Sequence, residues 1–442
     1  MEKQIVKLAL ILYNGGRPVP VYQEGVNIVN PALPRCHFVP DGEAREMPDG
    51  RLYVYGSYDR SGAEEYCSDV LHAFSTDDMI HWTDHGVIFR CSDIPWAEPG
   101  CKLFAPDCIH RDGKYYLYFC LSNDAEGVAV ADHPWGPFTD PKPIDIANGD
   151  GIDPAIFVDD DGQAYYYWGQ YSLRAARMNS DMRTLDAASI NRALIDEKRH
   201  GFHEGASVRK RNGLYYLVFS DITRGRPTCL GYAVSTNPLG PFEYKGIIID
   251  NTGCDPETWN DHGSIAQYKG EWYVFYHRSS QRSRYSRRLC IEPIRFEADG
   301  SIPEVLPTTQ GTEGPLQPGL IAAADACRLA GNGSKSHIRP DLRCPGEEVI
   351  AVESEKGWAA WRYVRFDQSI SEAVLEAEAE GCGTVKIWAD DDCIGEIAIQ
   401  PTSGNREQFS CPVSKVCGVK TLYLEWTMEE DCPMLLKSIC LR

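Results

Sequence analysis

The sequence predicts an all-β protein, a five-bladed β-propeller followed by a β-sandwich with a jelly-roll-like arrangement. Two observations predict this fold. A polar residue, glycine, two variable residues and tyrosine, followed by aromatic and apolar residues, recur five times in the first 280 residues. After about residue 308 the chain changes to short runs of alternating apolar and polar residues, separated by turn residues.

The five copies predict one blade each. A polar residue before glycine, followed by an aromatic-rich strand, is typical of a hairpin turn, where glycine adopts a conformation that other residues resist. A period of about 50 residues indicates a propeller, and the windows lack the apolar spacing of helical repeats. We therefore expect each glycine between the first and second strands of a four-stranded blade. The glycines, 63, 49, 51 and 57 residues apart, are Gly50, Gly113, Gly162, Gly213 and Gly270.

Three carboxylates share one position relative to these glycines. Asp41, Asp153 and Glu204 each stand nine residues before a repeat glycine. Asp107 stands six residues before the second glycine and His262 eight before the fifth. Because the innermost strand of every propeller blade starts at the central channel, we expect the three carboxylates to share one pocket.

Carboxylates held together in a cleft shift one another's pKa, so that one stays protonated while another is ionised. This is what general acid and base catalysis of glycosidic bond cleavage requires. Asp and Glu near strand ends also cap turns, which is their commoner role. Three of them at one offset favour catalysis instead.

The chain resembles the propeller enzymes of glycoside hydrolase family 43. The resemblance covers residues from about 28 to 308 and includes FAPDCIHRDGKYYLYF, DGIDPAIFVDDDGQAYYYWG, HEGASVRKRNGLYYLVFS and NDHGSIAQYKGEWYVFYH. It implies that Asp41 is the general base that activates water and that Glu204 is the general acid. Asp153 would raise the proton affinity of the acid and orient it. The resemblance also implies inversion, which needs roughly 6.5 to 9.5 Å between base and acid.

The resemblance implies further roles, each with a simpler structural alternative. His262 resembles a channel histidine that approaches a structural Ca²⁺ ion or a water cluster, although a buried, hydrogen-bonded histidine is an equal alternative. Arg287 stands where relatives present an arginine to substrate hydroxyls or to a catalytic carboxylate, and otherwise would be a surface cation. Asp107 is a candidate substrate-binding residue. No cofactor is expected for the chemistry itself.

Aromatic side chains are candidate sugar platforms, because a flat ring matches the apolar face of a sugar. We single out Phe38, Phe104 and Trp259 for this role. Most other aromatic residues, which with these make up 11% of the chain, are expected to pack the blades.

The predicted boundaries are an N-terminal extension at 1–27, the catalytic propeller at 28–308, a linker at 309–319 and the sandwich at 320–442. The stretch PTTQGTEGPLQPG is typical of a connection between domains. The sandwich resembles a family 6 carbohydrate-binding module, through segments such as GWAAWRYVRF and GTVKIWADDDCIGEIAI. Its Trp358 and Trp361 are candidate platforms, with core packing the favoured alternative. We expect this domain mainly to support the propeller.

Composition limits the partners and the compartment. A formal charge of −20 disfavours nucleic acid and anionic membranes, whose phosphates need a basic face. Seventeen cysteines, an odd number without paired spacing, favour reduced thiols and a cytoplasmic location. The N-terminus lacks a convincing signal peptide. The sequence does not indicate an oligomeric state.

The leading hypothesis is an inverting exo-glycosidase that releases terminal α-L-arabinofuranosyl or β-D-xylosyl units from plant-derived oligosaccharides, and so contributes to xylan degradation. Alternatives of the same fold are an endo-arabinanase and a galactose-directed glycosidase. An alternative of another class is a non-catalytic glycan-binding propeller. A retaining fructosidase would need an N-D-P-N-G type opening, which NPALPRCHFVPDGEA does not supply.

Overall fold

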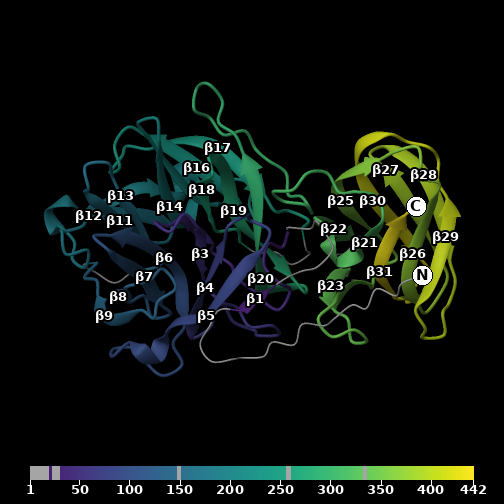
Figure 1. Cartoon of the computed structure of the whole chain (residues 1–442), viewed down its shortest axis with the longest axis horizontal. Coiled ribbons are helices and arrows are strands. Elements are labelled where there is room, and N and C mark those ends of the chain that lie inside the picture. The colour runs from purple at the N-terminus through teal and green to yellow at the C-terminus, as the bar shows by residue number, and fades with distance from the viewer. Residues whose placement is uncertain (1–18, 22–29, 147–150, 255–259, 332–335) are drawn as a thin grey trace.

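The computed structural model describes residues 19–21, 30–146, 151–254, 260–331 and 336–442. Its strands form a propeller of five sheets and a separate sandwich of two sheets (Figure 1), so the all-β prediction is confirmed. Within these residues, none of the helices has the length and apolar character needed to cross a membrane. The short helices are η1 (Cys91–Asp93), η2 (Ala187–Ser189), α1 (Glu197–His200) and η3 (Ala323–Asp325).

Each blade is an antiparallel sheet whose strands follow one another from the channel outward. The first blade has a fifth strand, β1, which pairs with β5 and lies within the predicted N-terminal extension. The blades consist of β1–β5 (Val19–Val21, Glu43–Glu46, Leu52–Gly56, Val70–Thr76, Trp82–Arg90), β6–β9 (Leu103–Arg111, Lys114–Leu121, Glu126–Ala131, Thr139–Pro143), β10–β13 (Ala155–Val158, Ala164–Trp168, Ser172–Arg177, Asn191–Asp196), β14–β17 (Phe202–Arg211, Leu214–Asp221, Cys229–Ser235, Glu243–Asp250) and β18–β20 (Ser264–Tyr268, Glu271–Ser280, Ser283–Ile294).

The repeat glycines occupy the turns between the first and second strands of the blades, as predicted. All five have positive φ angles, between 76° and 90°. In three of these turns the residue before glycine, Asp112, Asn212 or Lys269, also has positive φ, near 50°. Two consecutive residues of this kind form the hairpin turn that matches the twist of the strands.

The five innermost strands close into a ring. β2 contacts β6, β6 contacts β10, and the contacts continue through β14 and β18 back to β2. At the last seam the Ser264 hydroxyl donates to Gly42 O at 2.8 Å and accepts from Ala44 N at 3.1 Å. The first and fifth blades are therefore joined directly beside the channel.

A separate hydrophobic cluster fills each of the five interfaces between blades. The second strands show why the repeats are rich in aromatic residues. Tyr215, Leu217 and Phe219 pack toward the third blade, whereas Tyr216 and Val218 pack toward the fifth. Successive side chains of a strand point to opposite faces, so a strand buried on both faces needs an unbroken apolar run.

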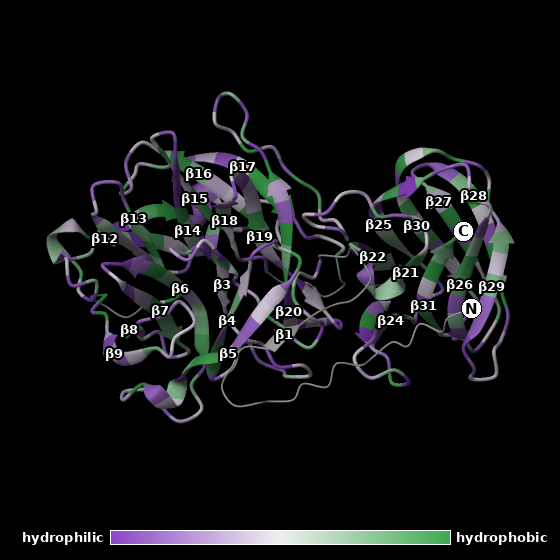
Figure 2. Ribbon diagram, in the orientation of Figure 1, coloured by the Kyte–Doolittle hydropathy of each residue, from purple (hydrophilic) through white to green (hydrophobic). Residues whose placement is uncertain are grey.

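The C-terminal strands form a two-sheet sandwich around one core (Figure 2), in which hydrophobic stretches follow the strands and many loops are hydrophilic. The domain boundaries given above remain predictions. One sheet contains β21 (Leu320–Ala322), β23 (His337–Pro340), β24 (Glu348–Val352), β26 (Glu372–Ala379), β29 (Glu407–Pro412) and β31 (Met434–Leu441); the other contains β22 (Arg328–Gly331), β25 (Lys356–Phe366), β27 (Gly383–Ala389), β28 (Asp392–Ile399) and β30 (Gly418–Met428).

A buried ion-pair network joins the sandwich to the propeller. Arg288 of β20 donates two hydrogen bonds to the Glu348 carboxylate, at 2.6 and 2.8 Å, and both side chains are less than 5% exposed. Arg35 binds the same carboxylate at 2.6 Å and also pairs with Asp325. Glu348 and Asp325 together therefore balance the two propeller cations at the domain interface.

Replacing Glu348 should weaken this interface strongly. Burial acts to raise the pKa of Glu348, but Arg288 and then Arg35 outweigh it and lower the pKa to about 2. This contribution to stability is present above the unfolded pKa of about 4.3 and is lost as pH falls through the folded value. We expect Glu348→Gln to cost about 3–5 kcal/mol at pH 7, because it leaves buried cations without a counter-charge. Calorimetric melting should show the loss, and the difference from wild type should narrow toward pH 2.

The matched control is Glu353→Gln. Glu353 is 43% exposed on its side chain and lies 3.9 Å from Arg282. An exposed pair of this kind contributes about 0–1 kcal/mol. Equal losses in the two variants would contradict the role given to Glu348.

Candidate active site

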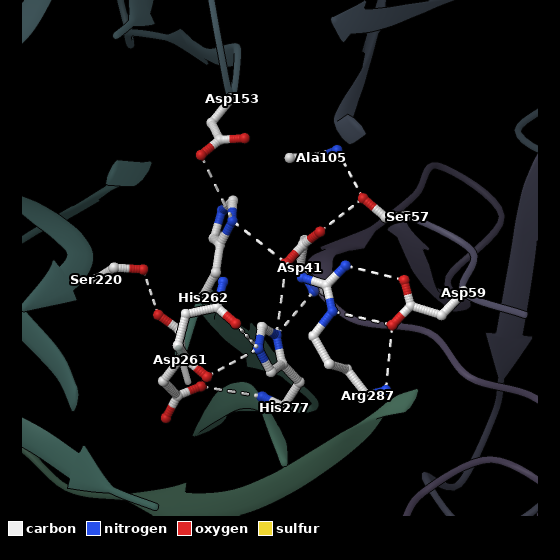
Figure 3. Close-up of polar contacts among 12 residues, drawn as sticks. Asp41, Ser57, Asp59, Ala105, Asp153, Ser220, Asp261, His262, His277 and Arg287 are labelled. Atoms are coloured by element: carbon white, nitrogen blue, oxygen red, sulfur yellow. Dashed lines mark hydrogen bonds and ion pairs between the residues drawn. The ribbon is translucent and has the colours of Figure 1, made fainter. Parts of the chain in front are cut away.

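Polar side chains from four blades lie together where the inner strands begin (Figure 3). His262 Nδ1 lies 3.5 Å from Asp41 Oδ1 and 3.9 Å from Asp153 Oδ2. Gly205, the residue after Glu204, faces the same imidazole so closely that a Cβ there would lie 2.6 Å from Cδ2. The equal spacing of the three carboxylates in the sequence thus corresponds to proximity in space.

Asp41 is buried and surrounded by hydrogen-bond donors. The Ser57 hydroxyl donates to Oδ2 at 2.6 Å, and Arg287 Nη1 donates to Oδ1 at 3.2 Å. Burial alone would raise the pKa of Asp41, but Arg287 and His262 outweigh it and lower the pKa below its ordinary value. Asp41 therefore stays ionised at neutral pH and is able to accept a proton.

Asp59 holds Arg287 in place. Arg287 Nε and Nη2 each donate to the Asp59 carboxylate at 2.9 Å, and the backbone N–H of Arg287 donates to Oδ2 at 3.1 Å. The two side chains are 3% and 0% exposed. Arg287 was expected to contact either substrate hydroxyls or a catalytic carboxylate. In the structure it contacts the carboxylate of Asp41.

His277 positions the backbone of Asp41. Burial, followed by the nearby charge of Arg287, lowers the pKa of His277 to about 3, so the ring is neutral. Its Nδ1 accepts from Asp41 N at 3.2 Å, which leaves Nε2 to donate to Asn260 O at 3.1 Å. Asp41 has a φ of +59° and Asp153 a φ of +52°. Such left-handed conformations are uncommon outside glycine and need support from their surroundings.

Glu204 is partly exposed and is held by two amide groups. Gln170 Nε2 donates to Oε2 at 2.6 Å and Asn260 Nδ2 donates to Oε1 at 3.3 Å. Asn260 therefore contacts both Glu204 and the histidine beside Asp41. The amides fix the carboxyl group of Glu204 while leaving it accessible.

Asp153 holds a proton more readily than an ordinary carboxyl group. Burial, followed by the charges of Glu204 and Asp41, raises the pKa of Asp153 well above its ordinary value. The site thus combines an ionised carboxylate, Asp41, with a carboxyl group, Asp153, whose pKa is raised.

The prediction for Asp107 is not supported. Both oxygens of this buried carboxylate accept from Arg45, at 2.9 and 2.7 Å, and Oδ2 also accepts from Ile156 N at 2.8 Å. Arg209 pairs with Glu43 beside this ion pair. Asp107 therefore neutralises a cation between the inner strands and does not offer a free group to a substrate.

The side chains near His262 do not fit the predicted Ca²⁺ ion. Calcium takes six to eight oxygen ligands, whereas His262 Nδ1 faces the Asp41 oxygen that Arg287 already binds. Arg45 and Arg209 add two buried guanidinium groups between the same inner strands. Among the described residues, the cluster suited to a metal is Asp341, Cys344 and Glu347 in the sandwich, where Arg406 and Lys437 already bind Asp341.

The aromatic candidates have different outcomes. Phe38 is 4% exposed and its ring faces the Arg288 guanidinium at 4.6 Å, so the structure does not support it as a sugar platform. Phe104 is partly exposed and remains a prediction. Trp259 lies outside the described residues. Trp361 is fully buried in the sandwich core, whereas Trp358 is partly exposed.

Ser57, Asp59 and His277 were not predicted from the sequence. A signal for two of them was present, because Ser57 and His277 each follow a repeat glycine by seven residues. The second strand of each hairpin runs antiparallel to the first and returns to the same end of the channel. A common distance from the repeat glycine therefore identifies channel residues at the ends of second strands as well as at the starts of first strands.

This arrangement suits acid and base catalysis. Asp41, the predicted base, has a depressed pKa and a fixed orientation, and the accessible carboxyl group of Glu204 lies in the same site as Asp153, whose pKa is raised. A pair of carboxyl groups in opposite protonation states is what hydrolysis of a glycosidic bond requires.

Known proteins are similar to this chain in sequence and in fold. The sequence profile Glycosyl hydrolases family 43 matches residues 37–302. A protein described as xylosidase/arabinosidase from Thermoclostridium stercorarium is 31% identical, over 93% of this chain and 98% of its own. The structure of a β-xylosidase/α-arabinofuranosidase from a compost microbial metagenome is 31% identical, with a TM-score of 0.54, over 65% of this chain and 99% of its own.

A further structure extends the similarity of fold to the sandwich. An arabinoxylan arabinofuranohydrolase from Bacillus subtilis matches 94% of this chain and 97% of its own, with a TM-score of 0.56 and 24% identity.

We predict that Ca²⁺ will not stabilise this protein. Millimolar CaCl₂ or EDTA should change the melting temperature by less than about 1 °C. The guanidinium groups of Arg45 and Arg209 repel a divalent ion, and the carboxylates beside them already bind these groups. MgCl₂ at equal ionic strength is the control for nonspecific salt effects. A saturable rise in melting temperature with Ca²⁺ but not with Mg²⁺ would contradict this prediction and indicate a specific Ca²⁺ site.

Proposed function

Because the chain belongs to glycosyl hydrolases family 43 and is a glycoside hydrolase, we propose that it releases terminal α-L-arabinofuranosyl or β-D-xylosyl units from plant-derived oligosaccharides. The observation that carries this proposal is the convergence of Asp41, Asp153 and the Glu204 segment on one imidazole: His262 Nδ1 lies 3.5 Å from Asp41 and 3.9 Å from Asp153, and Gly205, next to Glu204, faces the same ring. The names of the relatives, xylosidase/arabinosidase and β-xylosidase/α-arabinofuranosidase, support the sugar class.

In the proposed reaction, Glu204 gives its proton to the oxygen of the leaving group as the bond from that oxygen to the anomeric carbon breaks. A water molecule attacks the anomeric carbon from the opposite face and loses a proton to Asp41. Exchange with solvent then removes the proton from Asp41 and restores one to Glu204. A single displacement from the face opposite the leaving group inverts the anomeric configuration.

In this proposal Asp153 acts on the proposed acid, Glu204, electrostatically. The charge of Glu204 is one cause of the raised pKa of Asp153, so the two groups act on each other electrostatically. His262 lies between Asp41 and Asp153 and against Gly205, the residue after Glu204. This arrangement supports the proposal of a gap between Asp41 and Glu204 in which the attacking water is held. The chemistry uses carboxyl groups and water, with no cofactor.

The sandwich is proposed to support the propeller and to be related to family 6 carbohydrate-binding modules. Its partly exposed Trp358 lines a surface groove with Lys356 and Glu425, and the ring lies beside the Arg328 guanidinium. A cytoplasmic location is also proposed, and it is supported by the seventeen cysteines, all of which are free thiols.

Replacing the proposed acid tests the function. Wild type should release 4-nitrophenol from α-L-arabinofuranosides or β-D-xylosides, with NMR showing the inverted anomer first. Glu204→Gln should lower kcat/KM on an unactivated oligosaccharide by about 10²–10⁴-fold, because it removes the general acid. Asp161→Asn, at a repeat turn, is the control and should retain full activity. A non-catalytic glycan binder would show no turnover in any of these proteins.

Replacing Arg287 tests the assignment of the base. Arg287 lowers the pKa of Asp41, so Arg287→Met should raise that pKa and move the acidic limb of the kcat/KM profile to higher pH. The loss of activity should therefore be larger at pH 5 than at pH 8. Arg287→Lys keeps the charge and should move the limb less. An unchanged limb in Arg287→Met would exclude Asp41 as the titrating base.

A further inference from the structure

The segment 57–69, between β3 and β4, supports the proposed base from one side. Ser57 donates to Asp41, and Asp59 holds Arg287, as described above. Arg287 Nη2 also lies 3.3 Å from Cys67 Sγ. We call residues 57–69 the base loop, because its side chains surround the arginine that binds Asp41.

The base loop also places a tyrosine over this arginine. The ring centre of Tyr66 lies 4.8 Å from the guanidinium carbon of Arg287. Asp59 Oδ1 accepts from the backbone N–H of Cys67 at 3.0 Å, which fixes the chain directly after Tyr66. Tyr285 packs against the Tyr66 ring edge to face, with ring centres 4.7 Å apart. The Tyr66 ring is thus held from three sides.

The hydroxyl group of Tyr66 is buried but has no hydrogen-bond partner within the described part of the chain. A buried polar group without a partner costs about 1–3 kcal/mol, and such groups are rare in folded proteins. Burial raises the pKa of Tyr66 to about 12, so this hydroxyl keeps its proton and acts as a donor. An acceptor supplied by a ligand would remove the cost.

The position of Tyr66 indicates which ligand this is. Its ring covers the arginine that binds Asp41, and the Glu204 carboxylate is close enough to act on the phenol electrostatically. Because the sugar whose bond is cleaved must reach Asp41, a side chain over this arginine adjoins the space of that sugar. That sugar carries hydroxyl oxygens that accept hydrogen bonds.

We propose that the Tyr66 hydroxyl donates a hydrogen bond to a hydroxyl group of the sugar ring held between Arg287 and Glu204. Tyr66 is then a substrate-binding residue that selects for one hydroxyl of the released sugar. This inference rests on the proposed function, since it presupposes a glycoside in the pocket.

The test compares Tyr66→Phe with wild type on the better of the two 4-nitrophenyl glycosides and on its monodeoxy analogues, each lacking one ring hydroxyl. Tyr66→Phe should lower kcat/KM for the parent glycoside about 5–20-fold, because one hydrogen bond is lost. For one monodeoxy analogue, wild type and variant should agree within about 2-fold, since the partner hydroxyl is already missing. Tyr363→Phe, an exposed tyrosine of the sandwich, is the control and should match wild type on every substrate.

The ratio of parent to deoxy rates within one variant does not depend on the fraction of protein that is folded, so partial misfolding does not obscure the result. Equal loss on the parent and on every monodeoxy analogue would overturn the proposal, because Tyr66 would then act only by supporting Arg287. No loss on any substrate would also overturn it. A wild type that cleaves no glycoside would instead refute the proposed function.

Discussion

The contact between the first and fifth blades is the constraint on which the candidate active site depends. Asp41, Ser57 and Asp59 belong to the first blade, whereas His277 and Arg287 belong to the fifth. The base is therefore assembled only when the ring closes and Ser264 bridges the two inner strands. Asp59 and Arg287, whose side chains are 0% and 3% exposed, pair across this seam.

Closing five sheets around one axis also forces charges into a space with little water, where an unpaired charge is costly. The protein compensates these charges in two ways. Between the inner strands, Arg45 is paired with Asp107 and Arg209 with Glu43, so charge is neutralised. At the beginning of the strands the compensation is incomplete, and Asp153 takes up a proton instead. A carboxyl group whose pKa is perturbed because its charge is not fully compensated is typical of a functional site.

Neighbouring residues of β20 connect the site to the sandwich. Arg287 binds Asp41, whereas Arg288, on the opposite face of the same strand, binds Glu348 of the sandwich. Alternation along a strand sends successive side chains in opposite directions. The sandwich therefore anchors the strand that carries the arginine beside the base, which is a physical basis for its supporting role.

The sequence by itself determined the repeats, the turns at the five glycines and the common position of Asp41, Asp153 and Glu204, because these features follow from local patterns and a regular period. Only the tertiary structure decided what surrounds them. Asp107 stands in a motif like those of the proposed catalytic residues, yet Arg45 occupies both its oxygens. Phe38 lies near Asp41 in the chain, yet its ring covers Arg288. The hydroxyl of Tyr66, which has no partner among the described residues, has no signal in the sequence. Partners of this kind come from residues far apart in the chain, and the charge and burial that set their chemistry exist only after the blades close.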